Sequence, residues 1–206
     1  MRLACIGMGK MGRLVELTAP SMGHEIASDP LKADVWIEFT APDAAVANIE
    51  RAASAGKSIV VGTTGWYDAL PDVEEIVKGS GIGLVYGSNF SIGIHLFSKL
   101  AAYAKELTAP FAEYDVAGVE THHNEKVDAP SGTALQLSRS TGAPFSSVRV
   151  GSVVGTHTLL FDSPCDTIEL THRARSREGY ARGARYAAEW LLGRSGLHSF
   201  EEVVCS

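Results

Sequence analysis

The sequence predicts an α/β protein, with a doubly wound parallel sheet in its N-terminal part and a smaller α+β domain after it. Three observations predict this class. A glycine-rich turn directly follows the first apolar run, short apolar runs alternate with helical patterns as far as Tyr86, and longer runs of partly alternating polarity begin beyond Ile92. The second domain is expected to be built on an open mixed sheet.

The N-terminal elements follow one another at the spacing of β-α units. Five short apolar runs are expected to be strands, at residues 2–6, 24–27, 35–39, 58–61 and 83–86, and three helices are expected between them, at residues 11–18, 42–55 and 71–79. Parallel strands need such crossovers, so the alternation predicts a parallel sheet. A nucleotide would then lie across the carboxyl ends of these strands.

The first turn carries the pattern G-x-G-x-x-G, formed by Gly7, Met8, Gly9, Lys10, Met11 and Gly12. Taken alone, the pattern fits close packing of a helix on a strand equally well. Its place between the first strand and the first helix favours a dinucleotide site in a Rossmann-type domain. Asp29, about 20 residues further on, could hold a ribose hydroxyl, whereas Lys32 could pair with a 2′-phosphate, so both NADH and NADPH remain candidate cofactors.

The pattern changes after Ile92. Helices are expected at residues 95–107 and 130–138, strands at residues 114–120, 148–154, 157–162 and 166–172, and a last helix from 177 to about 192. We therefore expect a dinucleotide-binding domain of residues 1–91 plus 177–206, and a substrate-binding and oligomerisation domain of residues 92–176.

Residues 121–134, reading THHNEKVDAPSGTA, are the most chemically dense part of the chain. His122, His123 and Lys126 offer cations or protons, and the Ser-Gly-Thr turn opens a helix whose unpaired N–H groups can bind carboxylate or phosphate. Two ordinary alternatives remain at this point. The histidines could be structural, and Lys126 could form a solvated pair with Asp128.

The run E-x-H-H-x-x-K-x-D-A-P-S-G-T-A, from Glu120 to Ala134, resembles the signature of the dihydrodipicolinate reductase family. Further stretches agree in order along the chain: GMGKMG at residues 7–12, EFTAPDA at 38–44, VGTTG at 61–65, SNFSIG at 88–93, and a terminal run at 171–191. The resemblance implies reduction of dihydrodipicolinate (4-hydroxy-tetrahydrodipicolinate) by NADH or NADPH in lysine and diaminopimelate biosynthesis, and assembly as a homotetramer through the second sheet.

The resemblance also implies roles for individual residues. His122 would be the general acid, and Lys126 its cationic partner or an alternative proton donor. His123, Ser131, Gly132 and Thr133 would bind a carboxylate of a small dicarboxylate substrate. The loops expected to contact the nicotinamide half of the cofactor are Gly62, Thr63 and Thr64 in one and Gly87, Ser88, Asn89 and Phe90 in the other.

Composition narrows the range of partners. The formal net charge of −6 argues against nucleic acid. No apolar run reaches the roughly 18 residues that span a bilayer, and no signal peptide is evident, so we expect no membrane partner and a cytoplasmic location. Cys5, Cys165 and Cys205 lack metal-ligand spacing, and no metal site is expected.

The chain is short for the family it resembles, chiefly between the first helix and Val35, so the nucleotide domain could lack an element. Two other functions remain open. One is a Rossmann-type reductase of another small imine or oxo acid, and the other is a nucleotide-sensing homologue that has lost turnover. The intact H-H-x-x-K and S-G-T motifs argue against the sensor.

Overall fold

The computed structural model of the protein describes residues 1–205 and consists of two compact units. The first combines Met1–Ile92 with the segment that begins at Glu178, and the second is Gly93–Arg177. The chain thus leaves the first unit once and returns to it once. Each unit is described by itself below.

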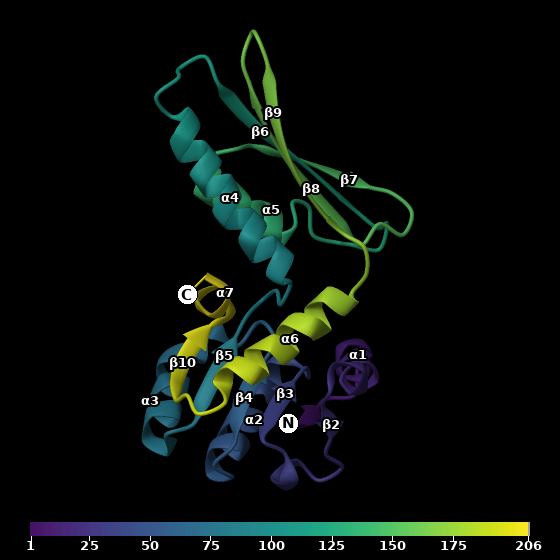
Figure 1. The fold of residues 1–206 in the computed structure, drawn as a ribbon, viewed down its shortest axis with the longest axis vertical. Helices are drawn as coiled ribbons and strands as arrows, with labels where there is room; N and C mark the ends of the chain where they lie inside the picture. The colour runs from purple at the N-terminus through teal and green to yellow at the C-terminus, as the bar shows by residue number, and fades with distance from the viewer. Residues whose placement is uncertain (206) are drawn as a thin grey trace. The chain divides into compact units, whose positions relative to one another are not determined.

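The first unit holds a six-stranded sheet in the order β10-β5-β4-β3-β1-β2, and every pair of neighbouring strands is parallel (Figure 1). Its strands are β1 (Arg2–Ile6), β2 (Glu25–Ile26), β3 (Val35–Glu38), β4 (Ser58–Val61), β5 (Gly83–Tyr86) and β10 (Gly196–Ser199). Its helices are α1 (Lys10–Thr18), α2 (Pro42–Ser54), α3 (Leu70–Ser80), α6 (Glu178–Leu191) and α7 (Phe200–Cys205), with short 3₁₀ turns at Pro20–Met22, Pro30–Lys32 and Tyr67–Ala69. The strand order reverses between β1 and β3, which is where doubly wound sheets bind ligands.

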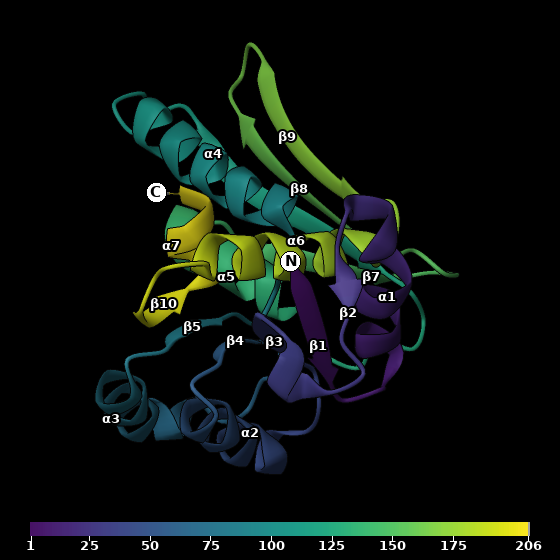
Figure 2. The same cartoon turned by 60° about the horizontal axis from the view of Figure 1, so that its bottom comes forward.

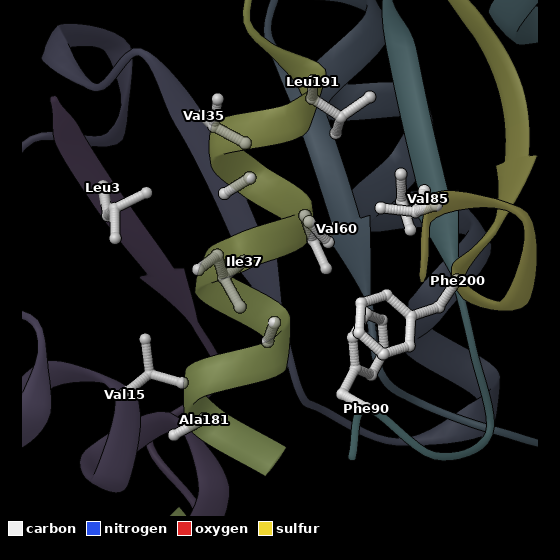
Figure 3. Close-up of a cluster of buried hydrophobic side chains, with 14 of the residues drawn as sticks. Leu3, Val15, Val35, Ile37, Val60, Val85, Phe90, Ala181, Leu191 and Phe200 are labelled. Carbon is white, nitrogen blue, oxygen red and sulfur yellow. The ribbon is translucent and has the colours of Figure 1, made fainter. Parts of the chain in front are cut away.

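Helices cover both faces of this sheet, and each face has its own apolar core. Figure 2 shows α2 and α3 on one side of β3, β4 and β5, with α6 on the other. The α6 side holds a cluster in which small residues of α6 let the helix lie close to Leu3, Val35 and Val60 (Figure 3). Strands covered on both faces are expected to be apolar throughout, and all four residues of β3 are buried.

The second unit is a four-stranded mixed sheet in the order β7-β6-β8-β9, with two helices on one face (Figure 1). Its elements are α4 (Ile92–Thr108), β6 (Asp115–His122), α5 (Gly132–Thr141), β7 (Phe145–Arg149), β8 (Gly155–Asp162) and β9 (Thr167–Ala174). Strand β6 is parallel to β7 and antiparallel to β8, which pairs antiparallel with β9. Side chains of α4 and α5 pack on Val116, Leu159 and Phe161 and form the core of the unit.

The fold class is confirmed, one strand was predicted in the wrong place, and two elements were not predicted. The strand expected at residues 148–154 lies earlier, at Phe145–Arg149, because Gly142 ends α5 in the left-handed conformation (φ +74°) and the chain becomes extended directly afterwards. Residues 150–154 form the turn to β8 instead. The final strand β10 and helix α7 were not predicted. The abbreviated region before Val35 keeps a strand, although β2 is only two residues long.

Candidate active site

The inward face of the second sheet changes character along its strands. At one end of β6 and β8 it is apolar, with Val116, Leu159 and Phe161 in the core. Toward the other end the same face carries Glu120, His122 and His157, all buried. Side chains two residues apart on a strand point to the same face, so Glu120 and His122 share it, while His123 lies one position beyond the end of β6. A polar cluster is therefore built into the end of an otherwise apolar layer.

Glu120 is the centre of this cluster, and its side chain has no exposed surface. Its Oε1 atom accepts hydrogen bonds from the Ser131 N–H (2.9 Å), the Ser147 hydroxyl (2.8 Å) and the Arg149 guanidinium (2.8 Å). Burial alone would raise the pKa of the Glu120 carboxyl, but the hydrogen bonds from Ser131, Arg149 and Ser147 outweigh it and lower the pKa to about 2. Glu120 is therefore a buried carboxylate at neutral pH.

The second carboxylate oxygen of Glu120 faces His122. The Oε2 atom lies 3.0 Å from His122 Nδ1, yet neither atom has an aligned hydrogen-bond partner, so the contact is one of charge. Burial lowers the pKa of His122, the charge of Glu120 raises it, and Lys126 and Arg149 lower it, with a net shift below the ordinary value. His122 therefore holds a proton less tightly than an ordinary histidine.

His157 completes the buried group. Its ring lies edge-to-face with that of His122, with centroids 5.2 Å apart, and its Nε2 atom is 3.3 Å from the Ser131 hydroxyl and 3.7 Å from Glu120 Oε2. Burial, followed by the neighbouring charge of His122, lowers the pKa of His157 to about 4. Ligand atoms of Glu120, His122 and His157 come within 4.8 Å of one another, close enough for a metal ion. Because Arg149 already balances the Glu120 charge, we interpret the group as an ion-paired network.

The loop after β6 presents the remaining residues of the predicted substrate site. Ser131 caps α5 by accepting the Ala134 N–H at 3.2 Å, and the helix begins with the exposed Gly132 and the half-buried Thr133. Lys126 is half-buried and pairs with Asp128 at 2.7 Å, and this bond is the first cause of the lowered pKa of the Asp128 carboxyl. His123 is half-buried and accepts the Lys126 N–H through its backbone carbonyl.

Arg149 fixes the shape of this loop. Its guanidinium donates to the carbonyl oxygens of Lys126 (3.3 Å) and Asp128 (2.6 Å) while also binding Glu120. Since Arg149 ends β7 and is the register partner of His122 on β6, the parallel pairing of these strands places it beside the loop. The same residue thus neutralises the buried carboxylate and holds the segment that carries Lys126.

In the first unit, the glycine turn has the geometry that a pyrophosphate group requires. Gly7 has φ +95°, and a β-carbon there would lie 2.2 Å from the Phe39 carbonyl oxygen. A β-carbon on Gly12 would lie 1.9 Å from the Gly7 carbonyl oxygen, whereas one on Gly9 would meet nothing within 4 Å. Gly9 is the N-cap of α1, which has no acidic residue in its first turn. The open helix end fits an anion, flanked by the exposed Met8 and Lys10 and the half-buried Met11.

The other two predicted cofactor loops follow β4 and β5. Gly62 lies against the Phe39 ring, Thr63 is buried, and Thr64 is exposed. The second loop contains the half-buried Gly87 and the exposed Ser88. The next residue, Asn89, is half-buried, and its side chain accepts the Ser91 N–H at 2.8 Å. Phe90 has only 2% of its surface exposed and packs on Phe200, so it could contact a cofactor only through its backbone.

Asp29 lies on the loop after β2, where a ribose-binding acid is expected. One of its carboxylate oxygens accepts the Leu31 N–H at 3.1 Å and caps the short turn Pro30–Lys32. Lys32 is exposed at the end of that turn. Both residues that could select between the two nicotinamide cofactors therefore belong to the same turn.

Comparison with known proteins decides the family. The family model described as the N-terminus of dihydrodipicolinate reductase matches residues 16–90, and the model of its C-terminus matches residues 93–204. The chain belongs to the dihydrodipicolinate reductase family. The match to the N-terminal model begins at residue 16, after the glycine turn.

Members of the dihydrodipicolinate reductase family match nearly the whole chain. The 4-hydroxy-tetrahydrodipicolinate reductase of Christiangramia forsetii is 32% identical and covers 99% of this chain and 98% of its own. That of Pseudomonas fluorescens is 38% identical over 83% of this chain and 73% of its own. The dipicolinate-bound dihydrodipicolinate reductase from Paenisporosarcina sp. TG-14 has the same fold, with a TM-score of 0.80 at 21% identity and 98% coverage of both chains.

The sequence predicts site roles for His122 and Lys126 and gives no role to three residues that the structure places around them. Glu120 is only the first residue of the signature, and His157 and Arg149 lie outside it. The spacing of Glu120 and His122 could have shown that they share a face of one strand. His157 and Arg149 come from the neighbouring strands, and their approach depends on a register that the sequence does not state. Among the described residues, no helix combines the length and apolar character needed to cross a bilayer.

Proposed function

We propose that the protein reduces 4-hydroxy-tetrahydrodipicolinate to tetrahydrodipicolinate in lysine and diaminopimelate biosynthesis, with NADH or NADPH as the hydride donor. The observation that carries the proposal is the buried Glu120–His122 pair at the end of β6, next to a loop that presents Lys126 and the N-terminus of α5. That arrangement offers a proton donor beside cationic and N–H groups for a carboxylate. Membership in the family names the substrate class.

The chemistry of the conversion sets what the protein must supply. The hydroxyl leaves as water together with a hydrogen of the neighbouring carbon, and the double bond so formed takes up one hydride at the first carbon and one proton at the second. The reduced nicotinamide supplies the hydride when it is bound, and the glycine turn with the open end of α1 is where its pyrophosphate would be held. We propose that the loops Gly62–Thr64 and Gly87–Phe90 contact the nicotinamide half and that Asp29 contacts the adenosine ribose.

The second unit would bind the dicarboxylate and deliver the proton. We propose that His122 gives its proton to the carbon next to the one that accepts the hydride, and that the Glu120 carboxylate stabilises the ring in its protonated form before transfer. Lys126 and His123 would supply positive charge to a substrate carboxylate. N–H and hydroxyl donors for the same carboxylate would come from Ser131, Gly132 and Thr133. When the substrate binds, the Lys126 ammonium would leave the Asp128 carboxylate and pair with the substrate carboxylate instead.

We also propose a cytoplasmic homotetramer assembled through the open face of the second sheet. Helices α4 and α5 pack on one face only, and the other carries Val119 and Val148, exposed by 36% and 43%, among threonines. A sheet face with exposed β-branched residues is a surface that a second copy can cover.

The experiment that tests the proposed activity is a coupled assay. Purified dihydrodipicolinate synthase generates the substrate, and oxidation of NADH or NADPH is followed by loss of absorbance. We expect turnover that depends on the synthase and is inhibited by pyridine-2,6-dicarboxylate. Turnover of other small imines or oxo acids, but not of this substrate, would favour a different reductase. Cofactor binding without turnover of any of them would favour a sensor.

A further inference from the structure

Glu38 is a second buried acidic residue that the reaction described above does not use. It ends β3 in the first unit and has no exposed surface. In the register of the parallel sheet its neighbours are Ile6 on β1 and Val61 on β4, both apolar. The fold therefore places apolar residues on both sides of this position, and an acidic residue here has no evident packing role.

One oxygen of Glu38 joins two loops at the carboxyl edge of the sheet. Its Oε1 atom accepts the Thr40 N–H at 2.9 Å and the Thr63 hydroxyl at 3.0 Å, and it also accepts the Thr40 hydroxyl. The Thr40 N–H is shared with the Thr63 hydroxyl oxygen at 2.8 Å. Thr40 lies after β3 and Thr63 after β4, so a single carboxylate oxygen ties the two loops together.

The glycine turn after β1 packs against the segment that carries Thr40. A β-carbon on Gly7 would lie 2.2 Å from the Phe39 carbonyl oxygen and 2.7 Å from the Thr40 methyl group. The Phe39 N–H also donates to the Ile6 carbonyl at 2.9 Å, so the contact between Phe39 and the turn is held by the strand pairing without Glu38. Three loops, after β1, β3 and β4, thus meet around Glu38 at the position where the strand order reverses.

This arrangement has a cost that packing does not explain. The second oxygen, Oε2, is buried without a hydrogen-bond partner, and within residues 1–205 no Lys, Arg or His forms an ion pair with Glu38. A buried, half-satisfied carboxyl destabilises the folded protein relative to an apolar residue. Glu38 lowers the stability of the folded protein and lies where the strand order reverses, which is where such sheets bind ligands. A role in ligand binding explains its presence better than packing does.

We propose that Glu38 is a positioning residue of the cofactor site, which holds the loop Gly62–Thr64 in the shape that receives the nicotinamide half of the dinucleotide. The proposal rests on the proposed use of NADH or NADPH. Glu38 acts through Thr63 and Thr40 and need not touch the cofactor, because its side chain is covered. It sets the loop on the nicotinamide side, whereas the open end of α1 holds the pyrophosphate independently of it.

The test compares whole cofactor with a fragment that lacks the nicotinamide. Dissociation constants for NADH, or for NADPH if that is the tighter ligand, are measured by nicotinamide fluorescence, and those for ADP by calorimetry. In Glu38→Ala the hydroxyls of Thr40 and Thr63 lose their acceptor, so we expect the cofactor Kd to rise about 10-fold or more while the ADP Kd stays within about twofold. Glu38→Gln keeps an acceptor oxygen and should give an intermediate cofactor Kd.

Two further variants keep the result interpretable. Thr63→Val removes the hydroxyl from the other end of the same hydrogen bond with little change of volume, and it should weaken cofactor binding in the same selective way if Glu38→Ala fails to fold. Ser58→Ala is the matched control, since Ser58 binds the Gly83 N–H at the opposite end of β4. This variant should leave the dissociation constants of the cofactor and of ADP unchanged.

The inference is overturned if Glu38→Ala or Thr63→Val binds the cofactor as tightly as the unmodified protein, or if either loses the cofactor and ADP in equal measure. Failure of the unmodified protein to bind either NADH or NADPH would instead refute the proposed function, and the inference with it.

Discussion

A β-carbon placed on Gly155 would lie 3.0 Å from the Nε2 atom of His122. Any side chain larger than hydrogen at this position of β8 would press on the ring edge opposite the Glu120 contact. With Glu120 beside Nδ1 and glycine beside Nε2, the imidazole is held by charge on one edge and left uncrowded on the other. That is the arrangement a proton donor needs, because the transferable proton must be reachable.

Removal of the acid should slow chemistry more than binding. His122→Gln retains much of the side-chain volume and polarity but cannot deliver a proton, so we expect kcat to fall by about 10² to 10⁴ with a much smaller change in KM. His198→Gln, a histidine of β10 in the other unit, is the control and should keep full activity. An unchanged kcat in His122→Gln would refute the assignment.

Loss of the Lys126 cation should affect the dicarboxylate and not the nucleotide. Lys126→Ala leaves a substrate carboxylate without its partner, so we expect the KM for substrate and the inhibition constant of pyridine-2,6-dicarboxylate to rise about 10-fold or more, together with a lower kcat. Lys126→Arg retains the charge, so its KM and inhibition constant should lie between those of Lys126→Ala and the unmodified protein. If only the cofactor KM changed, Lys126 would belong to the nucleotide site.

The pH dependence of kcat/KM should identify the proton donor. A histidine acid must be protonated, so kcat/KM should be highest at low pH and fall tenfold per unit above a pKa that burial, Lys126 and Arg149 hold below the ordinary value of 6.5. Glu120→Gln removes the charge that raises this pKa and should move the fall to still lower pH. A profile without this fall would show that His122 is not the proton donor.

Acid should destabilise the second unit in two successive steps. The pKa of His157 is about 4 in the folded protein and 6.5 when unfolded, so the unfolded chain binds the proton more readily, and stability is lost as the pH falls from 6.5 to 4. The loss approaches about 3 kcal/mol. Glu120, with a folded pKa of about 2, loses its contribution at lower pH, as the pH falls from 4.5 toward 2.

Urea unfolding at pH 7.5 and pH 4.5 measures the first step. His157→Gln cannot take up this proton, so its difference in unfolding free energy between the two pH values should be smaller than that of the unmodified protein. His198→Gln should retain the full difference. Equal pH dependence in all three proteins would show that His157 is not the group that resists protonation.

The proposed tetramer depends on the open face of the second sheet. Val119→Arg places a charge in the middle of that face, on β6, and we expect it to convert a tetramer into smaller species in light scattering at micromolar concentration. Leu17→Arg, an exposed position on α1, is the control and should not change the mass. A monomeric unmodified protein would refute the proposal directly.

The sequence predicted what depends on local pattern. The largely apolar strands β3 and β4 and the helix between them were placed to within a residue or two, because strands covered on both faces have few alternatives. The edge strand β10 was missed because its four half-buried residues show no such pattern. Helix α7 did have a sequence signal, the S-x-x-E spacing of Ser199 and Glu202. In the structure these two residues form reciprocal capping hydrogen bonds.

The buried polar cluster of the second unit was only partly predictable, for a different reason. Motif spacing identified His122, but Arg149 and His157 approach it through the pairing of β6 with β7 and β8, and that register is set by the whole sheet. Glu38 shows the same limit, since within its motif it resembles an ordinary strand residue. Its importance becomes visible only when the loops after two other strands are found to meet around it.

The interrupted first unit has a consequence for how the chain folds during synthesis. Helix α6 and Phe200 of α7 provide much of the core on one face of the parallel sheet, and they leave the ribosome only after the entire second unit. The N-terminal strands would therefore wait with Leu3, Val35 and Val60 uncovered while Gly93–Arg177 is translated. The usual order, in which N-terminal domains fold first, is expected to be reversed here, and the nascent N-terminal segment is the part that a chaperone would need to protect.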